Sequence, residues 1–222
     1  MDLDSFRNLV LVSELMAAIF GTIYFGKYKN TPLKYFLFLL WYIIITELTA
    51  GYASSTKTLG FINSEGIHYN YWFYNLLRIV TFCTMFYIYH QSISTAKFKK
   101  WIKLFAISYI SMVIVNWSFI QNFAFEMSEL PRILGSIFLI VSIIFYLIEL
   151  LRSEKIILYH RILLFWISVG FLLFYSGTIP FALKYNGYAL IPGIHKLFLI
   201  IYILAILMYS IFTFGFIWSK KE

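Results

Sequence analysis

The sequence predicts an all-α fold, a polytopic transmembrane helical bundle of about seven spans. Of its 222 residues, 61% are hydrophobic and only 13% are charged, and the apolar residues gather in runs of about 20. Soluble domains are about 45–50% apolar and about 25% charged, so one soluble core could not enclose this much apolar surface. We therefore expect residues 1–222 to form a single integral membrane domain.

Seven stretches are long and apolar enough to cross a hydrocarbon core about 30 Å thick. The predicted spans cover 6–26, 34–54, 71–93, 101–123, 132–151, 161–183 and 196–218. The first follows Asp2 and Asp4 rather than a basic segment, so we expect a retained helix and not a cleaved signal. The third, fourth and seventh have Trp72, Trp101 and Trp218 at their edges, where indole rings lie at headgroup level. The second, fifth and sixth qualify by length and apolar content.

The basic residues predict the orientation. Twelve Lys and Arg side chains lie near the span ends on one side and five on the other, and the richer side of a membrane protein faces the cytoplasm. We expect the N-terminus outside and the C-terminus in the cytoplasm. The largest basic cluster is a candidate docking surface for a protein partner or for anionic lipid, and it comprises Lys97, Lys99, Lys100 and Lys103. The net charge of +8 does not indicate nucleic-acid binding, because these residues form short clusters between apolar runs.

Polar residues at one depth form the candidate ligand or proton site. Glu14, Glu47 and Arg78 each lie seven or eight residues from the outer end of their spans, about 10–12 Å deep, and Asn116 reaches the same level. Asn75 shares a helix face with Arg78. Two carboxylates against one arginine leave one negative charge, which could hold a proton or receive a cationic group. The alternative interpretation is a purely structural ion pair that fixes helix register.

Small residues accompany the first carboxylate. Ala17, Ala18 and Gly21 follow Glu14 at helical spacing, which favours close helix approach. This face is predicted to point into the bundle.

The sixth predicted span contains a candidate helix break at Ser176, Gly177 and Pro180. Proline removes a backbone donor and frees a carbonyl one turn earlier, so the break could line a cavity. An ordinary proline kink near a helix end explains the same residues.

Missing motifs exclude several known classes of membrane protein and of active site. The last span has no deep lysine for a retinal Schiff base, and neither receptor triplets nor an H-E-x-x-H motif occurs. The lone Cys83 allows no intrachain disulfide, and no pair of histidines has metal-ligand spacing, so we predict no metal and no cofactor.

Three stretches of the sequence resemble a known group of proteins. They are residues 29–36, Thr46-Glu47-Leu48 and the aromatic run 71–89. These stretches resemble uncharacterised small polytopic membrane proteins of Bacteroidota-type bacteria. The resemblance implies no activity, and it suggests the bacterial cytoplasmic (inner) membrane as the location.

The leading functional hypothesis is a non-enzymatic sensor, receptor-like protein or accessory membrane subunit with a polar cavity in the outer leaflet. The second is a small-solute or proton-coupled transporter that uses the excess carboxylate. The third is a membrane-embedded lipid-modifying enzyme, which the missing catalytic motifs disfavour.

Overall fold

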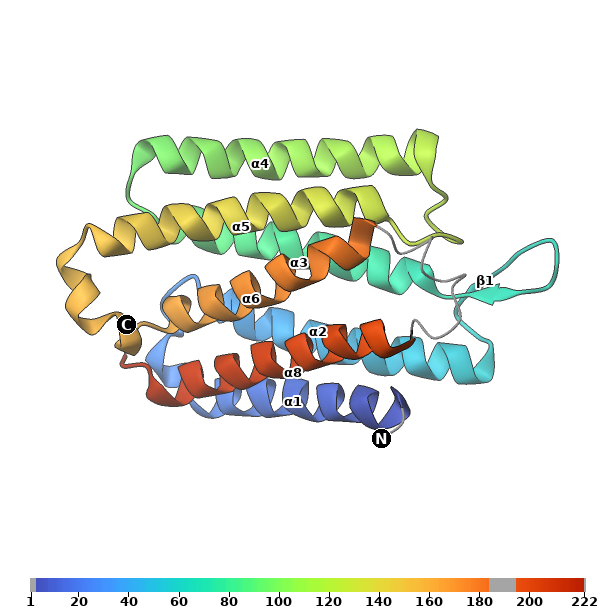
Figure 1. Cartoon of the computed structure of the whole chain (residues 1–222), viewed down its shortest axis with the longest axis horizontal. Coiled ribbons are helices and arrows are strands. Elements are labelled where there is room, and N and C mark those ends of the chain that lie inside the picture. The colour runs from blue at the N-terminus through green and yellow to red at the C-terminus, as the bar shows by residue number, and fades with distance from the viewer. Residues whose placement is uncertain (1–2, 184–194, 222) are drawn as a thin grey trace.

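The computed structural model describes residues 3–183 and 195–221, and in this part of the chain it is all-helical apart from one short hairpin (Figure 1). Seven long helices run alongside one another: α1 (Leu3–Ile23), α2 (Lys34–Thr56), α3 (Tyr71–Ser92), α4 (Ala96–Val115), α5 (Glu129–Leu151), α6 (Leu163–Leu183) and α8 (His195–Trp218). The hairpin pairs β1 (Phe61–Ile62) with β2 (His68–Tyr69) in antiparallel register. The predicted all-α bundle is confirmed.

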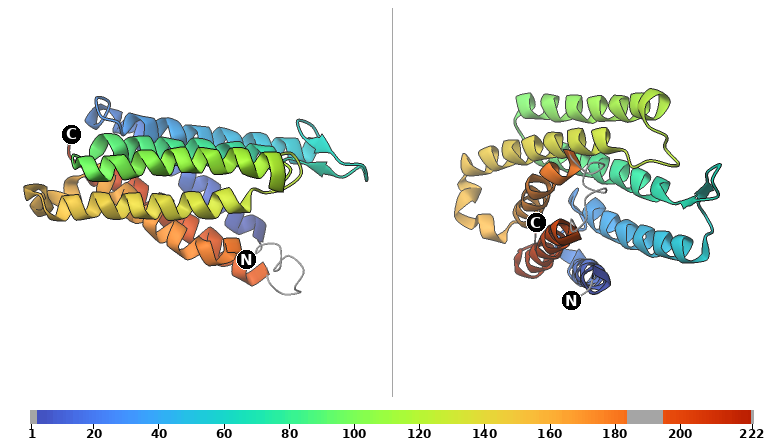
Figure 2. Two further views of the ribbon diagram at one scale, coloured as in Figure 1. Left: turned by 90° about the horizontal axis from the view of Figure 1, so that it is seen from above. Right: turned by 45° about the vertical axis from the view of Figure 1, so that its right-hand side comes forward.

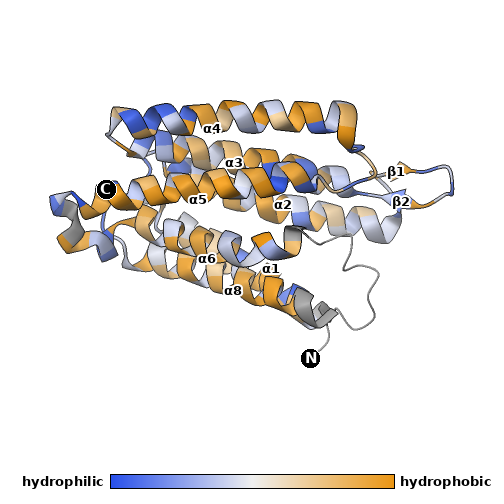
Figure 3. Ribbon diagram, turned by 45° about the horizontal axis from the view of Figure 1, so that its top comes forward, coloured by the Kyte–Doolittle hydropathy of each residue, from blue (hydrophilic) through white to orange (hydrophobic). Residues whose placement is uncertain are grey.

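Within the described residues, six helices are long and apolar enough to cross a membrane. The exception is α3, which carries Asn75 and Arg78 in its first half and His90 and Gln91 in its last turn. Hydrophobic residues cover the helices along much of their length, whereas hydrophilic residues concentrate at the start of α4 and after α5 (Figure 3). This distribution suits a protein whose solvent is lipid.

The two termini lie at opposite ends of the bundle (Figure 1). We call the end with β1 and β2 the hairpin end, and the end with the α3–α4 connection the lysine end. Six helices form a ring in the order α1, α2, α3, α5, α6 and α8, and α4 packs outside it against α3 and α5 (Figure 2). Most of the outer surface of α4 therefore faces away from the bundle.

Aromatic packing and hydrogen bonds close the lysine end. The Phe36 ring of α2 lies 5.0 Å from Phe212 and 6.1 Å from Phe216, both on α8. The Lys27 ammonium, in the short 3-10 turn η1 (Phe25–Lys27), donates to the carbonyls of Phe216, Ile217 and Ser219 at 2.8–3.0 Å. A cation at a helix C-terminus satisfies carbonyls that have no partner within the helix. The first and last helices are thus joined at this end.

Gly21 permits a close approach of three helices in this region. A Cβ built on Gly21 would lie 3.0 Å from both Leu37 of α2 and Phe216 of α8. The Tyr28 hydroxyl donates a hydrogen bond to the Gly21 carbonyl. Burial raises the pKa of Tyr28, so the hydroxyl stays protonated and can act as this donor. The small face of α1 is buried as predicted, with Ala17 and Ala18 fully enclosed.

The α6 helix is continuous through the candidate break. Ser176 and Gly177 are helical, and Pro180 lies in the last turn before Leu183. The Ser176 hydroxyl donates to the Leu173 carbonyl at 3.3 Å. Of the two interpretations, the structure lacks the candidate break and has a proline near a helix end, which costs only one hydrogen bond and does not require the helix to unwind. Gly177 instead makes room for Leu204 of α8.

Candidate functional site

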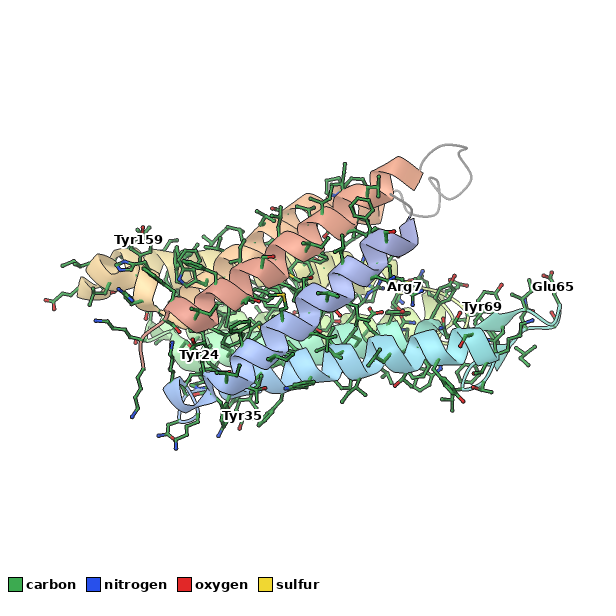
Figure 4. All side chains as sticks on the ribbon, turned by 90° about the horizontal axis from the view of Figure 1, so that it is seen from below. Arg7, Tyr24, Tyr35, Glu65, Tyr69 and Tyr159 are labelled. Carbon is green, nitrogen blue, oxygen red and sulfur yellow. The ribbon has the colours of Figure 1, made fainter. Side chains whose placement is uncertain are left out.

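A polar cavity of about 770 Å³ opens at the hairpin end, between the first half of α1 and the last third of α2. Its lining is Arg7, Asn8, Val10, Leu11, Glu14, Glu47, Leu48, Ala50, Gly51, Tyr52, Ser54, Asn70, Tyr74 and Tyr202. The α1–α8 pair diverges from α2 toward this end, and Arg7 lies between α1 and α2 there (Figure 4). The volume falls within the usual range of small-molecule sites, about 300–1,000 Å³.

Glu14 is the buried carboxylate of this cavity. Only 5% of the residue is exposed, and its Oε2 atom is buried without a hydrogen-bond partner in the described part of the chain. The hydroxyl of Tyr209, on α8, lies close enough to interact with the carboxyl group. A buried carboxylate with an unsatisfied oxygen is costly, so such a group usually has a binding or proton-carrying role.

Glu47 enters the same cavity from α2 and is better satisfied. It is half-buried, and it accepts a hydrogen bond of 3.3 Å from the Tyr74 hydroxyl of α3. The guanidinium of Arg7 also acts on Glu47 electrostatically. Glu14 and Glu47 are close enough for their charges to interact. The structure thus brings the two predicted carboxylates together.

Arg7 is the site residue that sequence reasoning missed. It is one of the five Lys and Arg residues on the predicted outer side, and it lies seven residues before Glu14 and therefore on the same face of α1. Its guanidinium Nη2 lies 3.4 Å from the position of a Cβ on Gly51, so the side chain crosses from α1 to α2. The i, i+7 spacing was the signal that could have found it.

Arg78 and Asn75 lie apart from this cavity. Asn75 is 1% exposed, donates to the carbonyls of Phe123 and Glu126 at 3.0 Å, and accepts the amide of Ser128 at 3.0 Å. Arg78 donates to the Ser128 carbonyl at 3.4 Å and contacts the Met127 sulfur at 2.8 Å. Both side chains therefore hold the 121–128 segment against α3.

Asn116 lies at a third place, at the end of α4. It begins a five-residue π-helical turn, η2 (Asn116–Ile120), and is fully buried. Neither polar atom of its side chain has a hydrogen-bond partner within the described residues. Its neighbour Trp117 donates to the Ser128 hydroxyl at 2.7 Å, which ties this turn to the same segment.

The predicted single cluster is thus divided around α3. Consecutive residues of a helix point about 100° apart, so Tyr74 faces Glu47 while Asn75 faces the 121–128 segment. Equal depth placed Glu14, Glu47 and Arg78 at one level but did not fix their directions. Arg7 supplies the guanidinium that we had expected from Arg78.

The cavity charge is unbalanced. Arg7, Glu14 and Glu47 are its charged lining residues, which gives one formal negative charge in excess. Among residues 3–183 and 195–221, no group of three His, Cys, Asp or Glu side chains could hold a metal ion. Fold and site together define a helical bundle, with six helices fit to cross a membrane, that carries an acidic cavity at one end.

No protein-family description, no curated protein and no solved structure matches the chain.

Proposed function

We propose that the chain is a non-enzymatic, multi-pass membrane protein, either a receptor-like sensor or an accessory subunit, that binds a small ligand in the acidic cavity. One observation carries the proposal. The buried Glu14 carboxylate lines a cavity of about 770 Å³, and one of its oxygens has no hydrogen-bond partner among the described residues. A carboxylate that served only to fix helix register would have its oxygens satisfied by protein donors.

The proposal includes a topology. All seven helices, α3 included, cross the bilayer, with the hairpin end outside and the lysine end in the cytoplasm. The positive-inside rule supports this direction, because the basic residues of the helix connections concentrate at the lysine end. As a member of the ring that packs against α2, α4 and α5, α3 can keep its polar residues away from lipid. We place the protein in a bacterial cytoplasmic membrane.

We propose that the protein acts in the cytoplasm through a protein partner that binds at the start of α4. Lys97, Lys100 and Lys103 are exposed, Lys99 is half-buried, and α4 stands outside the ring. The three exposed lysines, Lys97, Lys100 and Lys103, line one groove with Trp101. A partner with an acidic surface would complement this groove, since complementary charge steers association.

The transporter hypothesis is favoured by a different observation. The α1–α8 pair diverges from α2 at the hairpin end, while aromatic contacts close the lysine end, as in an outward-open carrier (Figure 4). Substitution Glu47→Gln should then abolish pH-coupled flux into liposomes. Unchanged flux in that variant would exclude coupling through Glu47.

The experiment that tests the proposal is purification in mild detergent, with mass spectrometry of both copurifying proteins and bound small molecules. The matched control is Glu14→Gln, which keeps the side-chain size and removes the charge. A small molecule present with wild type and absent from the control supports ligand binding, and a stoichiometric protein lost on substituting Lys97, Lys100 and Lys103 supports the accessory role. Identical small-molecule content in both preparations, with bulk lipid alone, would contradict the ligand-binding proposal.

A further inference from the structure

We infer that the cavity recognises a small organic monocation, an amine whose ammonium group lies against Glu14 beneath an aromatic wall. This inference rests on the proposed function, because it names the chemical class of the ligand for the same cavity. Five features of the lining support it: its charge, its size, the difference between the two carboxylates, the aromatic side chains, and the position of Arg7.

The charge of the cavity lining indicates the sign and the number of charges on the ligand. Two carboxylates and one guanidinium line the cavity, so one positive charge on the ligand would make the site neutral. Burying an unbalanced charge is expensive, and a bound monocation removes that imbalance, as a proton on one carboxyl group would in the absence of a ligand. An anionic ligand would add to it.

The size argument separates an organic cation from a bare ion. A volume of about 770 Å³ is many times that of one water, about 30 Å³. A hard metal cation also prefers six or more oxygen ligands, whereas the charged oxygens of this cavity come from two carboxylates. The remaining lining includes apolar and aromatic side chains such as Val10, Leu11 and Tyr202, which suit a hydrocarbon body.

The two carboxylates are not equivalent. Glu47 accepts a hydrogen bond from Tyr74 and is attracted to Arg7. Glu14 interacts with the Tyr209 hydroxyl but keeps Oε2 unpartnered in the described part of the chain. An ammonium group carries up to three donors and no acceptor, so it complements an acceptor that lacks a donor. The structure therefore assigns the ammonium to Glu14 rather than to Glu47.

The aromatic side chains give a second attraction. Tyr74 and Tyr202 line the cavity from α3 and α8, and Tyr52 lines it from α2. A cation over an aromatic face gains about 0.5–2 kcal/mol, depending on how much water is excluded. This term rewards an ammonium group and not a neutral hydroxyl.

Arg7 limits the ligand to one positive charge. Its guanidinium lies beside Gly51, which is four residues and about 6 Å nearer the hairpin end than Glu47 on α2. A diamine that filled the cavity would bring its second ammonium toward this guanidinium. Like charges at close range are repelled, so monoamines should bind more tightly than diamines of similar length.

The test uses the full chain in lipid nanodiscs and three probes: 2-phenylethylamine, its neutral analogue 2-phenylethanol, and 1,4-diaminobutane. Binding is measured by calorimetry for wild type and for Glu14→Gln. We expect the monoamine to bind wild type about tenfold more tightly than either other probe, and Glu14→Gln to remove that preference. The thermal unfolding midpoint of each preparation confirms that the variant is folded.

A second variant separates this inference from the proposed function. Leu11→Trp fills the cavity, and Leu104→Trp, on the exposed face of α4, is its size-matched control. Tighter binding of the alcohol or the diamine, lost in Leu11→Trp but not in Leu104→Trp, would overturn the monocation and leave ligand binding intact. Binding that is the same in wild type and Leu11→Trp for every probe would overturn both.

Discussion

Polar residues lie on two faces of α3 at the hairpin end, and the surroundings of the two faces differ. On one face, Tyr74 reaches Glu47 in an open cavity. On the other, Asn75 and Arg78 are occupied by backbone groups of the 121–128 segment. Polar residues whose hydrogen bonds are all made by the chain hold its structure, whereas a polar residue left partly unpaired beside a cavity can take a ligand.

The largest effect should come from Asn75→Ala. This change leaves two carbonyls and the Ser128 amide without their partner in a buried region, which should cost about 3 kcal/mol. The measurement is thermal unfolding in detergent, with Asn8→Ala at the cavity mouth as the control. Equal midpoints for the two variants would remove the structural role assigned to this face.

A smaller loss of stability is expected for Arg78→Met, about 1–2 kcal/mol, because Arg78 donates one long hydrogen bond to the Ser128 carbonyl and one to the weakly accepting Met127 sulfur. Binding of 2-phenylethylamine to the folded variant should match wild type. If Arg78→Met abolished binding as Glu14→Gln is expected to do, the two faces would not be separate, and the single cluster predicted from depth would be restored.

The opposite combination is expected for Glu14→Gln. Removing a buried charge with an unsatisfied oxygen should leave the unfolding midpoint unchanged or raise it, while amine affinity falls about tenfold. Paired melting and calorimetry on one preparation would check both parts. A large drop in stability would instead place Glu14 with the structural residues.

The smallest effect should come from Tyr74→Phe. It removes one hydrogen bond of 3.3 Å to Glu47 and keeps the aromatic wall. We expect stability to change by about 0.5–1 kcal/mol and amine affinity by about twofold to threefold. A loss as large as that of Glu14→Gln would show that Glu47, not Glu14, holds the ammonium.

Much of the fold was predictable because it follows from local pattern. The long apolar runs gave seven helices near the expected ranges, although α4 begins at Ala96, five residues earlier than its predicted span. Depth along each helix also follows from counting residues, which is why Glu14 and Glu47 were paired before their contacts were known.

The direction in which each side chain points did not follow from the same counting. It depends on which helices are neighbours, and the ring order places α8 beside α1 although they are distant in sequence. The tyrosine that contacts Glu14, Tyr209, comes from that helix. Ser128, which engages Asn75 and Arg78, lies in a connection whose path no periodicity describes.

The glycine contact at the lysine end is the point about which a tilt of α1 would turn. Gly21 touches both Leu37 and Phe216, and Lys27 fastens α1 to the end of α8 just beyond it. Arg7 lies fourteen residues from Gly21, about 21 Å along the helix axis. A tilt of α1 by about 10° about Gly21 would therefore move Arg7 by about 4 Å. A tilt this small would change the width of the cavity mouth, while the packing around Gly21 would stay almost the same.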